Sequence, residues 1–237
     1  TVVEVVYGEE LKGDRVASCF NNPIYHFTDC YRLSEGRNQI GTTLFERGFR
    51  MVQLTIRNFD RPVKVSQIRG IDRCYPFARR GSFFCSDYLL NRIYDVCQET
   101  LLACGSDTFI DPWRERGFWV NDLIVLNRAN LVCFGAQEIH RRCFELAFSQ
   151  SNEAGLLPAV CPAPRDNGSF DFIFAPTNLF MMLMLHDYWM YSGDGETVKK
   201  YLPHIERILN VLWEFADDKG VLTARGRSAK WTFCDCC

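Results

Sequence analysis

The sequence lacks a surplus of either charge. Its 237 residues include 27 Lys and Arg against 29 Asp and Glu, which gives a formal net charge of -2. A nucleic-acid-binding domain usually carries a basic patch or stripe, and an acidic tail carries a run of one sign. Neither pattern occurs in this sequence, so we expect no nucleic-acid partner.

The sequence also lacks an apolar run long enough to cross a membrane. A spanning helix needs about 20 consecutive apolar residues, but the most apolar stretch, residues 172–190, is interrupted by Pro176, Asn178, His186 and Asp187. This stretch predicts a helix buried inside the protein, and we expect no membrane partner. Residues 1–10 lack the basic and apolar segments of a signal peptide, and we expect the chain to begin inside a strand-rich region.

The sequence has no paired C-x-x-C knuckles, although it contains 12 cysteines. Several cysteines lie on apolar helix faces, which favours buried free thiols over a disulfide framework; these are Cys97, Cys104, Cys133 and Cys143. The C-terminal group Cys234, Cys236 and Cys237 has no histidine nearby, so we expect no metal site. We also expect no cofactor. Unpaired thiols favour the cytoplasm, but the sequence leaves both localisation and oligomeric state open.

The first third of the chain is rich in strand-forming residues. Val2–Tyr7 is a run of β-branched residues that ends at Gly8, and Gly48–Asn58 and Val63–Ile71 have a similar composition. Asp60, Arg61 and Pro62 are typical of a turn. The pattern therefore predicts a strand at Val2–Tyr7 and a hairpin formed by the two later segments.

Helical spacing replaces this pattern from Ser86 onward. Apolar residues recur at helical intervals from a Ser86 N-cap to Gly105, which predicts a first helix. A second helical region extends from Trp119 to Phe148, and Gly135 divides it.

Two further helices are expected near the C-terminal end. One begins at Pro176 and ends by Gly193, and its apolar residues lie nearly all round, so we expect other helices to enclose it. The other covers Glu196–Phe215, with a break or kink at Pro203. Strands followed by helix pairs predict two domains with a boundary near residues 76–86.

The segment Asp107–Asp122, DTFIDPWRERGFWVND, concentrates the side chains that sugar chemistry needs. If residues 112–122 are helical, Glu115, Trp119 and Asp122 lie on one face. A glycosidase uses one carboxylic acid to protonate the leaving oxygen and a second carboxylate to activate water, and an aromatic ring packs on the sugar.

A purely structural role also explains these residues of the segment Asp107–Asp122. Asp111 is a good N-cap, Pro112 suits the first helical position, and Glu115 is favourable near the positive end of a helix. Trp119 then is an ordinary core residue. The spacing alone favours this structural explanation.

The motif PWRERGFWVND resembles the catalytic signature of bacterial α-L-rhamnosidases, glycoside hydrolase family 78. This resemblance implies that Glu115 is the general acid and that Asp111 and Asp122 hold rhamnose hydroxyls. It implies that Arg114 and Trp119 shape the pocket. The chain departs from the family pattern because Asp111 directly precedes Pro112, and because Asn121 replaces a glycine.

Other segments resemble the same family in the same order along the chain: Thr43–Ile56, Gly81–Thr100, Gly155–Ala163, Tyr191–Leu209 and Lys230–Asp235. The last of these resembles an Asp-Trp element, which implies that Trp231 and Asp235 also bind substrate. Cys236 stands there in place of the expected tryptophan.

The resemblance implies a multidomain β + α protein. Residues 1–80 are expected to be the C-terminal part of a β-sandwich, and residues 81–237 the N-terminal part of an (α/α)6 six-hairpin barrel. The implied activity is removal of terminal α-L-rhamnose from a rhamnosyl glycoside, a carbohydrate, by an inverting acid/base mechanism. Two alternatives remain: another six-hairpin glycosidase with a different sugar, and an inactive carbohydrate-binding fragment.

The general base is expected beyond Cys237, because the family places it after the Asp-Trp element. The glutamates inside the chain lie mostly on amphipathic helices, where a solvated face is their ordinary place; they are Glu138, Glu145, Glu153, Glu196, Glu206 and Glu214. We therefore expect little or no rhamnosidase activity from residues 1–237 alone.

Overall fold

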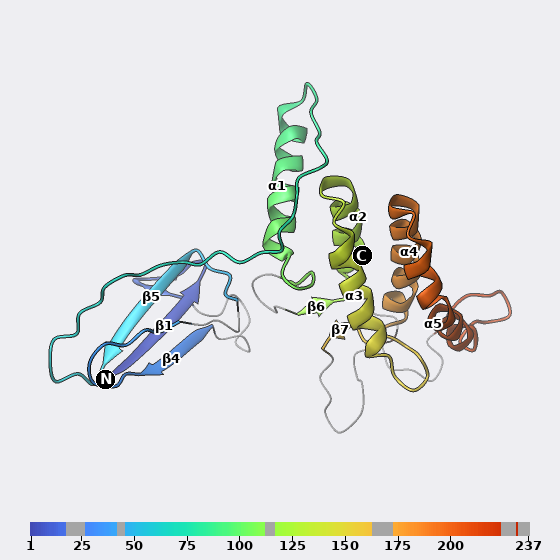
Figure 1. Cartoon of the computed structure of the whole chain (residues 1–237). Helices are drawn as coiled ribbons and strands as arrows, with labels where there is room; N and C mark the ends of the chain where they lie inside the picture. The colour runs from blue at the N-terminus through green and yellow to red at the C-terminus, as the bar shows by residue number, and fades with distance from the viewer. Residues whose placement is uncertain (18–26, 42–45, 112–116, 163–172, 224–230, 232–237) are drawn as a thin grey trace. The chain divides into compact units, whose positions relative to one another are not determined.

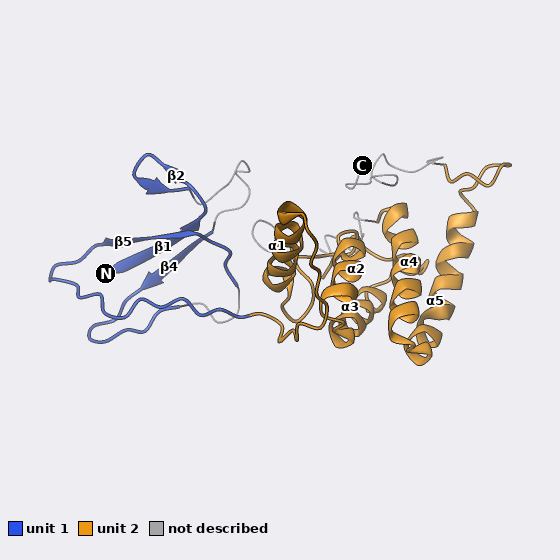
Figure 2. Cartoon of the chain, turned by 90° about the horizontal axis from the view of Figure 1, so that it is seen from above, with its two compact units in different colours: residues 1–73, 112–116 blue, residues 74–111, 117–237 orange. Residues whose placement is uncertain are grey.

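The chain forms two compact units in the computed structural model, which describes residues 1–17, 27–41, 46–111, 117–162, 173–223 and 231. Unit 1 contains residues 1–73, and unit 2 contains residues 74–111 and 117–237 (Figure 2). The three-stranded sheet belongs to unit 1, and the helices belong to unit 2 (Figure 1).

Unit 1 is built on a three-stranded antiparallel sheet. The central strand β1 (Val2–Gly8) pairs with β4 (Thr28–Arg32) on one side and with β5 (Met51–Arg57) on the other. The side chains of Val3 and Val5 point to the same face and are buried, as the two-residue period of a strand requires. The strands predicted at Val2–Tyr7 and within Gly48–Asn58 are confirmed. A short ladder joins β2 (Leu11–Lys12) to β3 (Arg15–Val16).

The predicted strand at Val63–Ile71 is wrong, and so is the hairpin that would contain it. This segment has no regular secondary structure, and the side chains of Val65, Ile68 and Ile71 are 52%, 73% and 91% exposed. β-branched residues favour a strand only where a neighbouring strand pairs with it and one face packs against other side chains. β5 pairs instead with β1.

The first helix, α1 (Tyr88–Cys104), begins one residue later than predicted. The N-cap is Asp87, whose Oδ1 accepts a hydrogen bond from the Leu89 N–H at 2.7 Å. Its negative charge also suits the positive end of the helix. The helix ends at Gly105, as predicted.

The second helical region consists of α2 (Leu123–Cys133) and α3 (Gln137–Ser149). Gly135 separates them with a φ of 60°, a left-handed conformation that favours glycine. The Asn130 carbonyl accepts the Phe134 and Gly135 N–H groups at 2.8 and 2.7 Å. The predicted division at Gly135 is therefore confirmed.

The third helix, α4 (Ala175–Ser192), has Pro176 in its first turn and ends at Gly193, whose φ is 69°. Both ends agree with the sequence. The expectation that other helices enclose α4 is wrong for the part of the chain that the structure describes. One side is buried, but three large side chains on the rest of the helix are 47%, 48% and 64% exposed: Leu183, Trp189 and Met190.

The fourth helix, α5 (Gly195–Trp213), continues through Pro203 without the break that the sequence predicts. α2 packs against α1 and α4, and α4 also packs against α3 and α5. Among the described residues, no helix is long and apolar enough to span a membrane.

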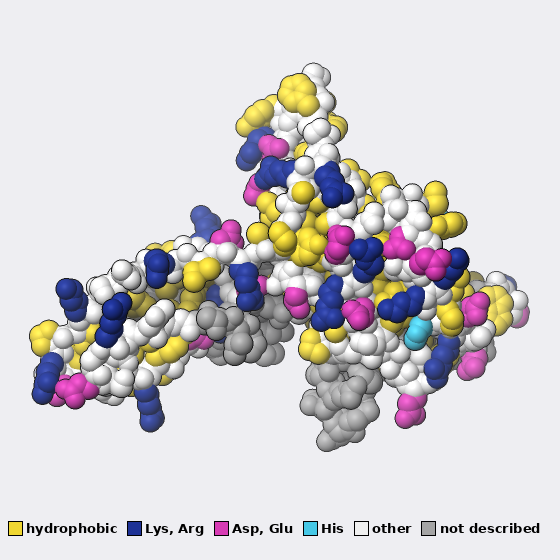
Figure 3. Space-filling model, viewed as in Figure 1, with side chains coloured by type: hydrophobic (Ala, Val, Ile, Leu, Met, Phe, Trp, Pro, Cys, Tyr) yellow, Lys and Arg dark blue, Asp and Glu magenta, His cyan; other side chains and the backbone are white. Residues whose placement is uncertain are grey.

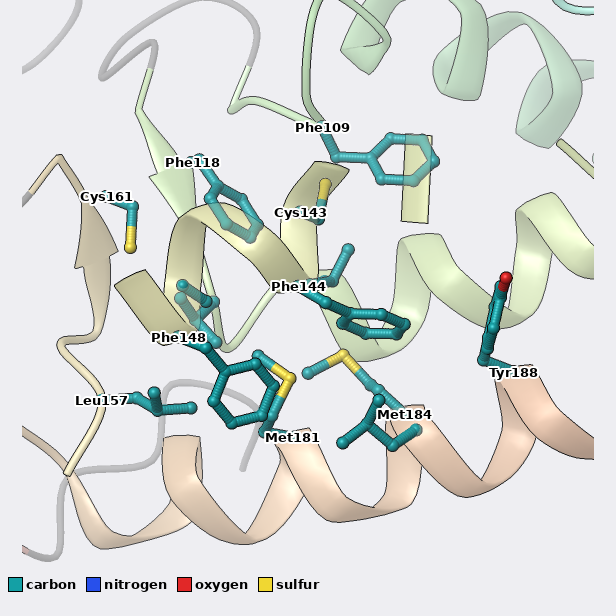
Figure 4. Close-up of a cluster of buried hydrophobic side chains, with 14 of the residues drawn as sticks. Phe109, Phe118, Cys143, Phe144, Phe148, Leu157, Cys161, Met181, Met184 and Tyr188 are labelled. Carbon is teal, nitrogen blue, oxygen red and sulfur yellow. The ribbon is translucent and has the colours of Figure 1, made fainter. Parts of the chain in front are cut away.

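The core of unit 2 lies between α3, α4 and the segments that lead into them (Figure 4). Phe144 and Phe148 from α3 meet Met181, Met184 and Tyr188 from α4, and all five are at most 3% exposed. The connecting segments add two more buried rings, those of Phe109 and Phe118. This core fixes the segment between α1 and α2, which contains the predicted site.

Eight cysteines lie in the described residues, and all of them are free. Cys104, Cys133 and Cys143 are buried, as the sequence predicts for thiols on apolar helix faces. The same expectation is wrong for Cys97, which is exposed. Cys19, Cys234, Cys236 and Cys237 lie outside the described residues.

Candidate functional site

A tight loop connects the end of α1 to Asp111. The Ile110 N–H donates to the Cys104 carbonyl at 2.8 Å, and Gly105 forms a β-bridge with Phe109. The Phe109 side chain is 1% exposed and anchors this loop in the core. Asp111 follows two residues later and is half-buried.

A backbone hydrogen bond joins Asp111 to Gly117. The Asp111 N–H donates to the Gly117 carbonyl at 3.0 Å. Pro112, Arg114 and Glu115 lie outside the described residues, and the roles predicted for them stay predictions.

From Phe118 to Asp122 the chain forms a strand and a turn, not a helix. β6 (Phe118–Trp119) pairs with β7 (Val160–Cys161), and the Val120 N–H donates to the Ala159 carbonyl at 2.7 Å. The prediction that Glu115, Trp119 and Asp122 share a helix face is therefore wrong. Phe118 and Val120 are buried on one side of the strand, and this two-residue period is the signal that helical spacing missed.

The strand places Trp119 opposite to its buried neighbours. Its side chain is half-buried. A Cβ atom built on Gly117 would lie 3.7 Å from Trp119 Nε1, so the indole lies beside the backbone of Gly117. The indole therefore lies next to Gly117, whose carbonyl accepts the Asp111 N–H.

Asp122 occupies the N-cap position of α2 without capping the helix through its side chain. Its backbone carbonyl accepts the Leu126 N–H at 3.3 Å, but no side-chain cap hydrogen bond is present within the described structure. An aspartate selected for capping normally accepts a hydrogen bond from the first turn.

Asp111 and Asp122 both act electrostatically on the thiol of Cys104. This thiol, which is 5% exposed, has its pKa raised to about 11, first by burial and then by the negative charges of Asp111 and Asp122. Both carboxylates are therefore within electrostatic range of the sulfur.

Asn121 holds this end of the segment against α4. Its side-chain oxygen accepts a short hydrogen bond from the hydroxyl of Thr177 in the first turn of α4. Asn121 is 4% exposed and Thr177 is fully buried. The one sequence signal for this contact is that Asn121 replaces the glycine of the resembling signature. The hydrogen bond fixes the residue that directly precedes Asp122.

Trp231 is buried in the core cluster of unit 2. It is 3% exposed, and its ring centroid lies 5.2 Å from that of Phe215. Asp235 lies outside the described residues. The substrate contacts predicted for Trp231 and Asp235 stay predictions.

The glutamates that the sequence assigns to solvated faces are exposed, as expected: Glu138, Glu145, Glu153, Glu196, Glu206 and Glu214. Among the residues that the structure describes, no group of three or more His, Cys, Asp or Glu could hold a metal ion.

His140 is buried in unit 2, whereas His186, which lies in the helix that the sequence predicts to be buried, is exposed. The side chain of His186 is 62% exposed, whereas His140 is fully buried and burial lowers its pKa to about 3. The Asn130 amide nitrogen lies 3.3 Å from a ring nitrogen of His140 and donates to the Ala136 carbonyl at 2.9 Å. This polar contact links α2 to α3, and the sequence analysis missed it.

Asp194 joins α4 to α5. Its carboxylate accepts hydrogen bonds from the Tyr188 hydroxyl at 2.7 Å, the Thr197 hydroxyl at 2.6 Å and the Thr197 N–H at 3.0 Å. Arg141 adds an ion pair at 3.3 Å. These donors, those of Thr197 first, hold the pKa of Asp194 well below its usual range. The pattern D-x-x-T at the start of α5 is the sequence signal that could have identified this cap.

Comparisons with known proteins agree with the resemblance. The family described as the bacterial alpha-L-rhamnosidase 6 hairpin glycosidase domain matches residues 78–237. A solved GH78 rhamnosidase from Bacillus sp. GL1 is 27% identical with a TM-score of 0.74, over 99% of this chain and 23% of that chain. No curated protein sequence matches the chain.

Two more distant solved structures share the fold. The rhamnosidase from Klebsiella oxytoca, solved with rhamnose bound, is 20% identical with a TM-score of 0.67, over 98% of this chain and 46% of that one. The α-L-rhamnosidase from Streptomyces avermitilis, complexed with L-rhamnose, is 18% identical with a TM-score of 0.67, over 92% and 21%. The present chain thus spans less than half of each solved chain. Because the family match covers most of its length, the chain belongs to the bacterial α-L-rhamnosidase six-hairpin glycosidase family.

Proposed function

We propose that the protein is a glycoside hydrolase that removes terminal α-L-rhamnose from rhamnosyl glycosides with inversion at the anomeric carbon. Family membership supports a glycosidase. The solved relatives from Klebsiella oxytoca and Streptomyces avermitilis, which hold rhamnose, support this sugar as the substrate. Residues 1–80 belong in this proposal to a β-sandwich, and residues 81–237 to the first part of the barrel.

The observation that carries the proposal is the family match over residues 78–237, which contain the motif with Asp111, Trp119 and Asp122. Carboxylates can accept hydrogen bonds from sugar hydroxyls while the sugar ring packs on an indole. In the proposal, Asp111 and Asp122 orient rhamnose, Trp119 and Arg114 shape the pocket, and Trp231 and Asp235 complete it.

Glu115 acts in this proposal as the general acid that protonates the leaving oxygen. An inverting enzyme also needs a second carboxylate, about 6.5–9.5 Å from the acid, to activate water. The six exposed glutamates on the helices and loops of unit 2 lack the enclosed surroundings that such a base needs. We assign the base to none of them.

The test is release of L-rhamnose by the longest form of the enzyme that contains residues 1–237. Glu115→Gln should lower the rate on an alkyl rhamnoside by about 10²–10⁴-fold, the usual contribution of general acid catalysis. An activated aryl rhamnoside should suffer less, because its leaving group needs little protonation.

Glu145→Gln is the matched control, since Glu145 is exposed on α3 and only pairs with Arg142. Its activity should equal that of the wild type on both substrates. Equal rates of the wild type and Glu115→Gln on the alkyl substrate would remove Glu115 from the role of acid. Asp122→Asn should raise KM for both substrates, which tests the sugar-binding role separately.

A further inference from the structure

Two adjacent polar side chains in the first turn of α4 are completely buried. Charged side chains lie on the surface of unit 2 (Figure 3), whereas Thr177 and Asn178 are both 0% exposed. Threonine and asparagine are also poorer helix formers than leucine and methionine, the commonest residues of α4. Buried polar groups need hydrogen-bond partners, so the partners of these two side chains show what this turn holds.

Thr177 holds the end of the segment that precedes α2. Its hydroxyl donates to the side-chain oxygen of Asn121, which is 4% exposed. Asn121 directly precedes Asp122, which occupies the N-cap position of α2. The backbone that carries Asp122 is therefore fixed by a buried hydrogen bond to a different helix.

Asn178 holds the other strand of the β6–β7 ladder. Its side-chain oxygen accepts the Leu157 N–H at 2.8 Å, and its amide nitrogen donates to the Leu157 carbonyl at 3.4 Å. Leu157 lies just before β7, in which Val160 pairs with Trp119 of β6. The strand that carries Trp119 is thus held by β7, and the segment that leads into β7 is held by Asn178.

The capping chemistry of α4 does not explain these contacts. A threonine or an asparagine at the start of a helix ordinarily accepts a backbone N–H of the first turn. Asn178 makes one local contact, since its amide nitrogen also donates to the Phe174 carbonyl at 3.0 Å. The Thr177 hydroxyl and the Asn178 oxygen bond instead to segments 56 and 21 residues away. One turn of α4 therefore fixes two segments that lead to residues of the candidate site.

We propose that Thr177 and Asn178 are positioning residues for the sugar-binding groups of the proposed function, on which this inference rests. Thr177 positions Asp122 through Asn121. Asn178 positions Trp119 through β7, and neither side chain touches the sugar. Binding groups act at full strength only when a supporting layer holds them within about 0.5 Å of the productive geometry. Both hydrogen bonds are buried, where such a bond is electrostatically stronger than in water.

The test compares KM and kcat for an aryl rhamnoside in the longest form of the enzyme that contains residues 1–237. Thr177→Val removes the hydroxyl and keeps the shape of the side chain, so it should raise KM roughly tenfold with a smaller change in kcat. Thr177→Ser keeps the hydroxyl and should have a KM near that of the wild type. Tyr188→Phe is the matched control, because it removes a hydroxyl that bonds to Asp194 three turns further along α4, about 16 Å away. It should leave KM unchanged.

Double-mutant cycles separate positioning from a general loosening of unit 2. If Thr177 acts through Asp122, Thr177→Val should raise KM no further once Asp122→Asn is present. Asn178→Leu should also raise KM, and it should do so much less in Trp119→Ala. A factor that is the same in both backgrounds would overturn the role of the residue concerned. Circular dichroism verifies folding, and the Thr177 cycle decides the proposal if Asn178→Leu does not fold.

The thiol of Cys104 gives a second measurement that needs no substrate. The charge of Asp122 contributes to its raised pKa, so a carboxylate that loses its fixed position should lower the pKa of the thiol. Thr177→Val should therefore lower this pKa when Asp122 is present but not in Asp122→Asn, as followed by the pH dependence of Cys104 alkylation. An equal shift in both would overturn the positioning of Asp122 by Thr177. An unchanged KM in Asp122→Asn would contradict the proposed function instead, and the thiol measurement then decides this inference by itself.

Discussion

Asp111 and Asp122 lie eleven residues apart in the segment that connects α1 to α2, yet the charges of both carboxylates raise the pKa of the same buried thiol, that of Cys104. Two contacts hold the backbone beside them. The Asp111 N–H donates to the Gly117 carbonyl, and the Asn121–Thr177 hydrogen bond holds the residue before Asp122 against α4. The pKa of the Cys104 thiol therefore reports on the charges of Asp111 and Asp122.

Removing either negative charge should lower the pKa of Cys104. Asp111→Asn and Asp122→Asn each eliminate one of the two charges that raise it, while burial, the largest cause, remains. The pH dependence of Cys104 alkylation, followed by mass spectrometry, measures this pKa. Asp107→Asn is the control, because Asp107 does not contribute to the shift. A thiol whose pKa responds to only one of the two aspartates would contradict their joint effect on Cys104.

Breaking the Asn121–Thr177 contact should destabilise unit 2. Thr177→Val removes the donor and leaves the buried Asn121 oxygen without that hydrogen bond, which costs about 1–3 kcal/mol of unfolding free energy. Urea unfolding measures the loss. Ser149→Ala removes a hydroxyl that is exposed and bonds only within α3, and it should change stability by less than about 0.5 kcal/mol. Equal effects of the two substitutions would show that the Asn121 contact is not a special anchor.

Asp194 should make unit 2 sensitive to acid. Its folded-state pKa lies below its ordinary value because Thr197, Tyr188 and Arg141 stabilise the carboxylate. The stabilisation is therefore complete above the ordinary aspartate pKa of about 3.9 and is lost as the pH falls below it. Asp194→Asn should lower the unfolding free energy by about 1–3 kcal/mol at neutral pH and flatten the decline in acid.

Glu196→Gln serves as the comparison for Asp194. Glu196 lies in the same first turn of α5, but its side chain is 86% exposed and pairs only with Lys199. Its replacement should leave both the stability and its pH dependence nearly unchanged. Chemical unfolding at a series of pH values distinguishes the two positions.

His140 should contribute a second pH dependence at milder acidity. Burial lowers its pKa to about 3, so between about pH 6.5 and pH 3 the unfolded chain binds a proton that the folded protein does not. The unfolding free energy should therefore fall as the pH decreases, by at most about 1.4 kcal/mol per pH unit from this residue. His140→Gln should reduce the slope in this range, whereas His186→Gln, at an exposed position, should not. Identical slopes for the wild type and His140→Gln would exclude a buried neutral His140.

Short-range chemistry was enough to predict several elements. The β-branched run of β1 predicts a strand, and Gly105, Gly135 and Gly193 each mark the end of a helix because a glycine there ends the helical pattern or takes a left-handed φ. The order of the motifs also identifies the family, which the match over residues 78–237 confirms. These features depend on residues that are close together in the chain.

The predictions from sequence were wrong where contacts between distant segments determine the secondary structure or the burial of a residue. Trp119 was expected on a helix, but β6 pairs with β7, which lies far along the chain. Val63–Ile71 has strand composition but finds no neighbouring strand with which to pair. His140 was overlooked because its burial depends on helices that meet only in the folded protein.

The sequence by itself determined the C-terminal ends of α1, α2 and α4, the central strand and the family. Each of these follows from backbone preferences or from side chains at fixed spacing. Only the tertiary structure decided that the charges of Asp111 and Asp122 both act on Cys104, since this depends on the hydrogen bond between Asp111 and Gly117 and on the buried bond from Asn121 to α4. Hydrogen bonds between distant segments form only when packing has removed water from their surroundings, and no local pattern encodes which segments will meet.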